Sequence, residues 1–194
     1  MTVLAYSYER LVNAIAYFAN QHEKVAKGPL YKTTLLKYIA LFYYKVLLES
    51  GEPPLELNFL AMENGPVAEE IYVGLNEKAL HAEEFEIYNS SDGQGDKILV
   101  KANKYDMDFF SEFEIEIMDS LIQEFATNYK NNKKIIDATH ELPPWKNAWA
   151  SRGKAGMRKM MDEDIFINKE KSLAEEHFAI YKGIKGISNA PYHR

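Results

Sequence analysis

The pair His140-Glu141 is the first place in this chain where residue types and spacing suggest catalysis. The zinc-protease motif His-Glu-x-x-His places two imidazoles one helical turn apart, so that both bind one metal ion. Here the second histidine position is Pro144, and Pro143 would end the helix that the motif needs. The other histidines are scattered, at positions 22, 81, 177 and 193. We therefore expect no metal site.

Other catalytic signatures are missing from the sequence as well. The chain has no cysteine, which excludes thiol nucleophiles, disulfides and cysteine-ligated metals. It also has no Gly-x-Ser-x-Gly sequence of the kind that presents a hydrolase nucleophile. We expect Thr139-His140 to cap or bond backbone groups near a helix end. The sequence thus predicts a protein that is not an enzyme and that binds no cofactor.

Charge is distributed unevenly along the chain. Between positions 52 and 96, eleven acidic residues face one lysine, a net of −10, whereas between 130 and 159 eight basic residues face two acidic ones, a net of +6. Such asymmetry favours charged partners, although two solvated faces would give the same pattern. Residues 153–156 read Gly-Lys-Ala-Gly, similar to the Gly-x-x-Gly clamp of one RNA-binding module. Nucleic-acid binding through 130–159 therefore remains an alternative.

The elements that would position these residues are mostly helices. Apolar residues at helical spacing predict an amphipathic helix over about 7–26, ended by Gly28-Pro29. Residues 31–49 are apolar nearly all round, which predicts a central helix with neighbours on several sides. Lys37, Lys45 and Glu49 limit its strongly apolar run, Ile39 to Leu48, to well short of the ~20 residues that a bilayer requires, so we expect no membrane span. Tyr43 and Tyr44 are adjacent, and we expect only one of them to point inward.

The remaining segments alternate between turns and short elements. We expect Gly65-Pro66 to open a third helix, because proline suits the first helical turn. Residues 85–88 and 97–100 predict a β-hairpin, and Ser111 with Glu114 predicts a capping box at the start of an amphipathic helix. Further helices are expected over 133–138, from Pro144, and over 172–182, with Gly183 as the residue after the last helix. The expected fold class is mainly α (α+β), a helical bundle around the central apolar helix with a small antiparallel β-hairpin or sheet insertion.

The order of these elements resembles a known family. An apolar helix, an extended segment, a Gly-Pro-Val sequence, a hairpin, a capped helix and a Thr-His…Pro-Trp ending follow one another over about residues 8–150. This arrangement is similar to the Panacea domain, the SocA-like antitoxin family often found in phage-associated proteins. The residues that carry the resemblance are Gly65, Pro66, Val67, Tyr72, Thr139, His140, Pro144 and Trp145.

The resemblance implies a non-enzymatic antitoxin that binds a cognate toxin protein, either blocking it or delivering it to a protease. We expect a Panacea-like domain over 1–150, and a C-terminal helical extension over 151–194, outside the resemblance, that packs on the same domain. Because toxins that act on nucleic acids tend to be basic, the acidic stretch supplies the partner-binding candidates. These are Glu69, Glu70, Glu83 and Glu84. The absence of cysteine and of a basic leader fits a cytoplasmic protein.

Overall fold

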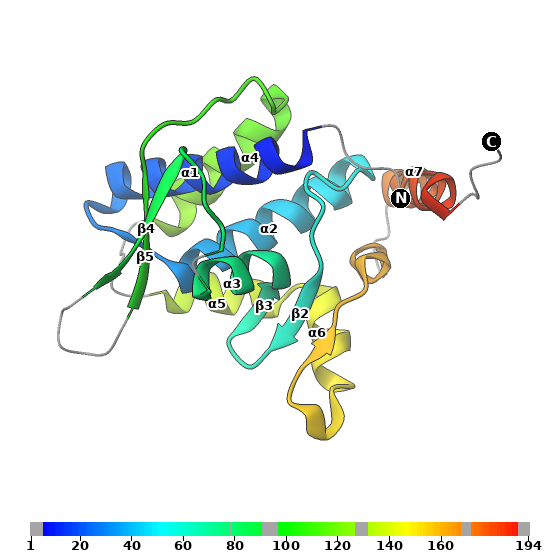
Figure 1. The fold of residues 1–194 in the computed structure, drawn as a ribbon. Coiled ribbons are helices and arrows are strands. Elements are labelled where there is room, and N and C mark those ends of the chain that lie inside the picture. The colour runs from blue at the N-terminus through cyan, green and yellow to red at the C-terminus, as the bar shows by residue number, and fades with distance from the viewer. Residues whose placement is uncertain (1–5, 78, 91–96, 127–131, 168–171, 190–194) are drawn as a thin grey trace.

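The central helix predicted from the sequence organises the whole structure. The computed structural model describes residues 6–77, 79–90, 97–126, 132–167 and 172–189. Helix α2 (Lys32–Ser50) lies in the middle, and its residues from Thr34 to Leu47 are almost all buried. Helices α1 (Ser7–Ala26), α4 (Glu112–Phe125), α5 (Lys133–His140) and α7 (Ser172–Asn189) contact it, as Figure 1 shows. A helix that is apolar all round needs this enclosure.

Aromatic side chains fill the interface between α1 and α2. The rings of Phe18 and Tyr38 stack with their centroids 5.1 Å apart, and Phe42 packs edge-on against Phe18 at 6.1 Å. The Tyr38 hydroxyl lies 3.1 Å from Nδ1 of the buried His22. Burial of rings on this scale is the main source of stability for the α1–α2 pair.

Two small antiparallel sheets flank the bundle. The first has the order β1-β5-β4, from β1 (Leu30–Tyr31), β4 (Phe85–Ser90) and β5 (Lys97–Ala102). The second has the order β3-β2-β6, from β2 (Phe59–Met62), β3 (Gly65–Ala68) and β6 (Arg158–Lys159). The expected fold class is confirmed, and the hairpin at 85–102 is where the sequence placed it. The second sheet was not predicted.

Gly65 and Pro66 do not begin a helix, which corrects the sequence-based prediction. They lie in β3, where Pro66 is paired with Ala61 of β2, and α3 (Glu69–Asn76) begins three residues after Pro66. β3 is an edge strand, a position that tolerates a residue without an N–H. Glu69 and Glu70 do fall in the first turn of α3, where the helix dipole favours acidic side chains.

The second half of the chain follows the predicted elements closely. Ser111 and Glu114 form the expected capping box at the start of α4. α6 (Pro143–Ala150) begins with its two prolines, as expected. Gly183 does not end the last helix: Gly183 and Gly186 both lie within α7, which continues to Asn189.

Tyr43 and Tyr44 are both buried, contrary to the expectation that one would face outward. They are 2% and 0% exposed, and their hydroxyls donate to Asp162 at 3.0 Å and 3.3 Å. Asp162 starts the 3-10 helix η2 (Asp162–Phe166), and the Tyr181 hydroxyl of α7 donates to it at 3.4 Å. The C-terminal segment covers the side of α2 that carries Tyr43 and Tyr44, and this cover buries both side chains. One shared carboxylate satisfies all three buried hydroxyls.

A candidate toxin-binding face

Helix α3 follows the Gly-Pro-Val motif and has a row of exposed residues, the α3 stripe, along one face. One residue of this stripe is aromatic. Glu69, Tyr72, Val73 and Asn76 occupy positions i, i+3, i+4 and i+7, which share one face of a helix. Tyr72 is 37% exposed and Val73 42% exposed. The opposite face of the helix, with Ile71 and Leu75, is buried. α3 is therefore anchored on one side and offers an aliphatic–aromatic pair on the other.

Lys32 fixes the outer face of α3 to the start of α2. Its Nζ donates to Asn76 Oδ1 at 2.6 Å and lies 4.8 Å from the centroid of the Tyr72 ring. The cation over the ring and the hydrogen bond one turn further on together limit the positions that the Tyr72 side chain adopts. An exposed aromatic residue that is already ordered loses little conformational entropy on binding.

The four acidic candidates do not form a single cluster. Glu69 and Glu70 lie side by side on α3, but the Glu70 carboxylate accepts hydrogen bonds from the backbone and side-chain amides of Asn58, at 3.1 Å and 2.6 Å. Glu83 and Glu84 form the turn before β4, and Glu83 pairs with Lys104 at 2.7 Å. Glu70 and Glu83 thus have structural partners, which leaves Glu69 and Glu84 as the acidic side chains best placed to meet another protein.

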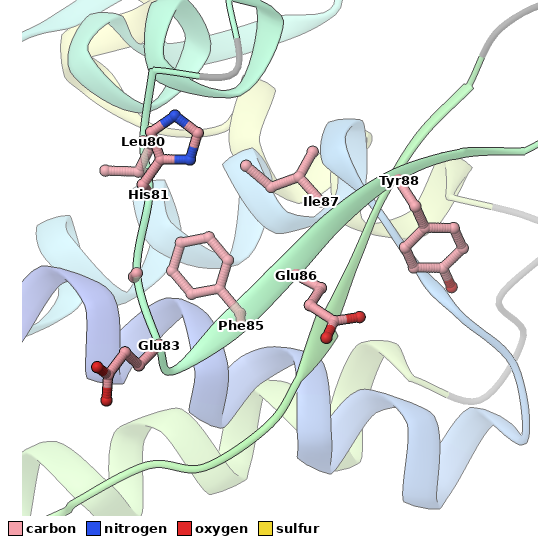
Figure 2. A pocket seen from close by; sticks show the side chains of 8 residues that line it. Leu80, His81, Glu83, Phe85, Glu86, Ile87 and Tyr88 are labelled. Atoms are coloured by element: carbon pink, nitrogen blue, oxygen red, sulfur yellow. The ribbon is translucent and has the colours of Figure 1, made fainter.

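A pocket of about 630 Å³ lies between the segment that follows α3 and strand β4. Figure 2 shows its two walls: the segment 80–82 that leaves α3, and strand β4. Phe85 and Ile87 point from β4 toward the 80–82 segment, whereas Glu86 and Tyr88 point to the other side of the strand. The lining mixes apolar side chains with carboxylates at the rim, as protein-binding surfaces commonly do.

The two motif regions meet at a buried lysine. Lys37 of α2, only 3% exposed, donates from Nζ to the Pro66 carbonyl at 2.9 Å. Gly65 has φ +98, and a Cβ added to it would lie 2.7 Å from Thr139 Oγ1 and 3.2 Å from Lys37 Nζ. Thr139 itself is fully buried and donates to the Ile136 carbonyl at 2.7 Å. The glycine is thus required both by its backbone conformation and by the close approach of α2 and α5.

Burial lowers the pKa of Lys37 to about 7, far below its ordinary value. Sequence reasoning counted Lys37 only as a charge that interrupts the apolar run. Its position in an apolar helix did not decide this burial, because Lys45 of the same helix is exposed. The hydrogen bond from Lys37 to the Pro66 carbonyl ties α2 to β3, and through β3 to the start of α3.

The Thr-His…Pro-Trp ending forms a stack of rings next to this lysine. The His140 ring lies 4.0 Å from that of Trp145 with an interplanar angle of 17°, and Trp149 continues the stack at 5.5 Å. Trp145 Nε1 donates to the Met62 carbonyl at 3.1 Å, which links α6 to β2. Arg152 covers the end of the stack, 3.7 Å above the Trp149 ring.

His140 is held neutral rather than poised for proton transfer. Desolvation, and then the nearby charge of Lys37, lower the pKa of its imidazole. Its Nε2 is buried without a hydrogen-bond partner in the structure. Among the residues that the structure describes, no three histidine or acidic side chains gather to hold a metal ion. The motif residues therefore form a packed junction between α2, β3, α5 and α6.

Three of the eight basic residues in the 130–159 stretch pair with neighbouring carboxylates. Lys133 pairs with Asp137 at 2.6 Å, Lys146 with Glu141 at 2.6 Å, and Lys134 with Glu124 at 3.5 Å. The Gly-Lys-Ala-Gly sequence forms the 3-10 helix η1 (Gly153–Ala155) and a turn. These pairings use charges that an RNA or DNA backbone would need. Position 130 lies outside the described residues. No helix within the described ranges is long and apolar enough to cross a membrane.

A comparison with protein families finds a match that includes all of the motif residues described above. The model of the family described as "Antitoxin SocA-like, Panacea domain" matches residues 35–146, which is 112 of the 194 residues. The chain belongs to this family. Its membership indicates an antitoxin role, and thus a toxin as partner and binding rather than catalysis as its task. No curated protein and no solved structure matches the chain.

Proposed function

We propose that this protein is the antitoxin of a toxin–antitoxin module and neutralises its cognate toxin by direct contact through the α3 stripe and the adjoining pocket. We call this surface, formed by Glu69, Tyr72, Val73 and the pocket residues 80–88, the α3–β4 face. The toxin would be met in the cytoplasm, where both proteins are made.

The observation that carries the proposal is the exposed Tyr72–Val73 pair on α3, a helix whose opposite face is buried. Tyr72 is more than one-third exposed and lies within the residues that the family model matches. The junction below it fixes β3 through Lys37, and β3 leads directly into α3. Buried motif residues thus hold an exposed aromatic side chain in a set position, which is how binding hot spots are commonly built.

Charge supports the same face. Residues 69–90 contain six acidic residues against one lysine, and Lys32 and Lys104, which contact Tyr72 and Glu83, bring the net charge of the face to −3 with histidine neutral. A basic toxin would be attracted to this face at a rate that falls with added salt. The charges of the face therefore act mainly on association, whereas Tyr72 and Val73 act on dissociation.

A co-expression experiment tests the proposal. The protein encoded by the adjacent gene is induced with and without this chain, and growth is recorded; binding of the purified pair is then measured by calorimetry. Tyr72→Ala should weaken binding by about 2 kcal/mol or more, the size typical of a hot spot. Phe113→Ala on α4 is the matched control, because Phe113 is also 37% exposed. Equal effects of the two substitutions would place the interface elsewhere.

A second pair of variants tests the charges. Reversing Glu69 and Glu84 to lysine should slow association at low salt. Reversing Glu112 and Glu116 on α4 changes the charge equally, and Glu112 also lies in the first turn of its helix, so the dipole penalty is matched. The same association rate for both pairs would refute the placement of the charged partner.

Delivery of the toxin to a protease is the other mode of neutralisation that the family suggests. The two modes differ in the fate of the toxin. Direct inhibition leaves the amount of toxin unchanged while growth recovers, whereas delivery shortens the half-life of the toxin. A pulse-chase measurement of toxin half-life, with and without this chain, separates them. We expect an unchanged half-life together with restored growth.

A further inference from the structure

Strand β4 ends its sheet with one side unpaired for most of its length. In the sheet order β1-β5-β4, β4 pairs with β5 from Phe85 to Ser90. On its other side, the described part of the chain supplies one bridge, between Ala82 and Phe85 across the turn Glu83-Glu84. Beyond Phe85, no other described segment pairs with the strand. An open edge of this kind is a template for another strand.

The ladder shows which backbone groups face the open side. Asn103 N–H donates to the Glu84 carbonyl at 2.7 Å, and Asn103 lies opposite Glu84 when the β4–β5 register is continued by one step. Hydrogen bonding alternates along an antiparallel pair, so Glu86 and Tyr88 bond to β5. The N–H and C=O groups of Ile87 and Asn89 therefore point away from β5, toward the open edge.

The pocket lies along this same edge. The segment 80–82 ends beside β4, at the bridge between Ala82 and Phe85. It forms the wall of the pocket opposite β4 (Figure 2). The pocket is lined by apolar side chains from both walls, including Leu80, Phe85 and Ile87. A strand added beyond the Ala82–Phe85 bridge would pair with the rest of the open edge of β4. Every second side chain of that strand would enter the pocket.

We propose that the toxin binds by adding an extended segment of its own chain to the open edge of β4 at Ile87 and Asn89. The segment carries apolar side chains at alternate positions, which fill the pocket, and a net positive charge. The charge follows from the acidic residues 69, 70, 77, 83, 84 and 86 on α3, on the segment after it and on β4, which outnumber the lysines at 32, 78 and 104. This inference rests on the proposed function and adds the mode of recognition to it.

Amide hydrogen exchange measured by NMR tests the edge directly, with the protein encoded by the adjacent gene as the probe. In the free protein, the amide of Tyr88 should be protected and those of Ile87 and Asn89 should exchange rapidly. In the complex, the amides of Ile87 and Asn89 should slow by about 100-fold or more. Binding that leaves these two amides at their free rates would overturn strand addition while leaving the antitoxin function in place.

Asn89→Pro provides the matching variant. Proline removes only the outward N–H at this position, and the open side of an edge strand tolerates it. Its affinity for the toxin should fall about tenfold or more. Asn89→Ala keeps the N–H and removes the side chain, so its affinity should match that of the wild type. A loss of affinity in both variants would assign the effect to the side chain and overturn the proposal.

Two further results have distinct meanings. If wild-type protein neither restores growth nor binds the probe, the proposed function fails, and the inference fails with it. If light scattering shows that the protein alone is a dimer, and Asn89→Pro converts it to a monomer, the edge belongs to a second copy of this chain. That result would overturn the assignment of the edge to the toxin.

Discussion

Replacing Gly65 with alanine tests whether the two motif regions are held together by close approach. Gly65 has φ +98, so any residue with a Cβ is strained there. The new Cβ would also lie 2.7 Å from Thr139 Oγ1 and 3.2 Å from Lys37 Nζ, both on helices that are packed in place. Neither neighbour has room to withdraw, because Thr139 is 0% and Lys37 3% exposed.

The expected loss of stability has two parts. Left-handed backbone costs an alanine about 1–2 kcal/mol, and a methyl group forced into a packed interior costs about 1–3 kcal/mol. The sum, about 2–5 kcal/mol, is a large part of the ~5–15 kcal/mol that stabilises a typical domain. Gly153→Ala is the matched control: φ is +61 there, but nothing lies within 4 Å of the added Cβ. That variant should lose only about 1–2 kcal/mol.

Equilibrium unfolding in urea, followed by circular dichroism, measures both variants against the wild type. Gly65→Ala should be less stable than Gly153→Ala by about 1–3 kcal/mol. Adding Thr139→Ala to Gly65→Ala should recover part of that difference, because it removes the nearest atom. If the two glycine variants lose the same free energy, the close approach of β3 to α2 and α5 has no energetic consequence and the argument for the junction is wrong.

Three further outcomes follow from the structure. Trp145→Ala should lower the free energy of unfolding by about 3–5 kcal/mol; an unchanged melting temperature with loss of toxin binding would instead place the ring in the interface. Burial lowers the pKa of Lys37 to about 7 from 10.5 in the unfolded chain, so the unfolded chain binds more protons between these values. Stability relative to Lys37→Met should therefore rise with pH from about 7, by up to about 1.4 kcal/mol per pH unit. Finally, Asp162→Ala removes the acceptor of the buried Tyr43 and Tyr44 hydroxyls and one acceptor of Tyr181, and amide exchange in α7 should increase more than in Asp164→Ala.

Much of the fold was readable because it follows from local rules. Ser111 and Glu114 satisfy free N–H groups at the start of α4 whatever surrounds them, so the capping box fixes the helix start in sequence and structure alike. The apolar character of residues 31–49 likewise requires enclosure, and α2 is enclosed. The wrong predictions concern choices between two permitted states. Pro66 suits a helix start and an edge strand equally, and pairing with β2 decided for the strand.

The candidate site was readable only in part. Tyr72 and Glu69 could be named because they follow the Gly-Pro-Val motif, but their exposure depends on what α3 packs against. The partners of Glu70 and Glu83 come from Asn58 and Lys104, and neither pairing has a signature in sequence spacing. The pocket and the open edge of β4 arise from strand order, which no single segment encodes.

The sequence by itself determined the helical core, the capped start of α4, the hairpin and the family, because periodicity, turn chemistry and motif order act over a few residues at a time. Tertiary structure decided that Lys37 is buried beside Gly65 and Thr139, that both Tyr43 and Tyr44 point inward, and that β4 lies at an edge. These outcomes depend on contacts between segments from 28 to more than 100 residues apart. Their free energies come from packing and desolvation, which exist only once the chain has brought those segments together.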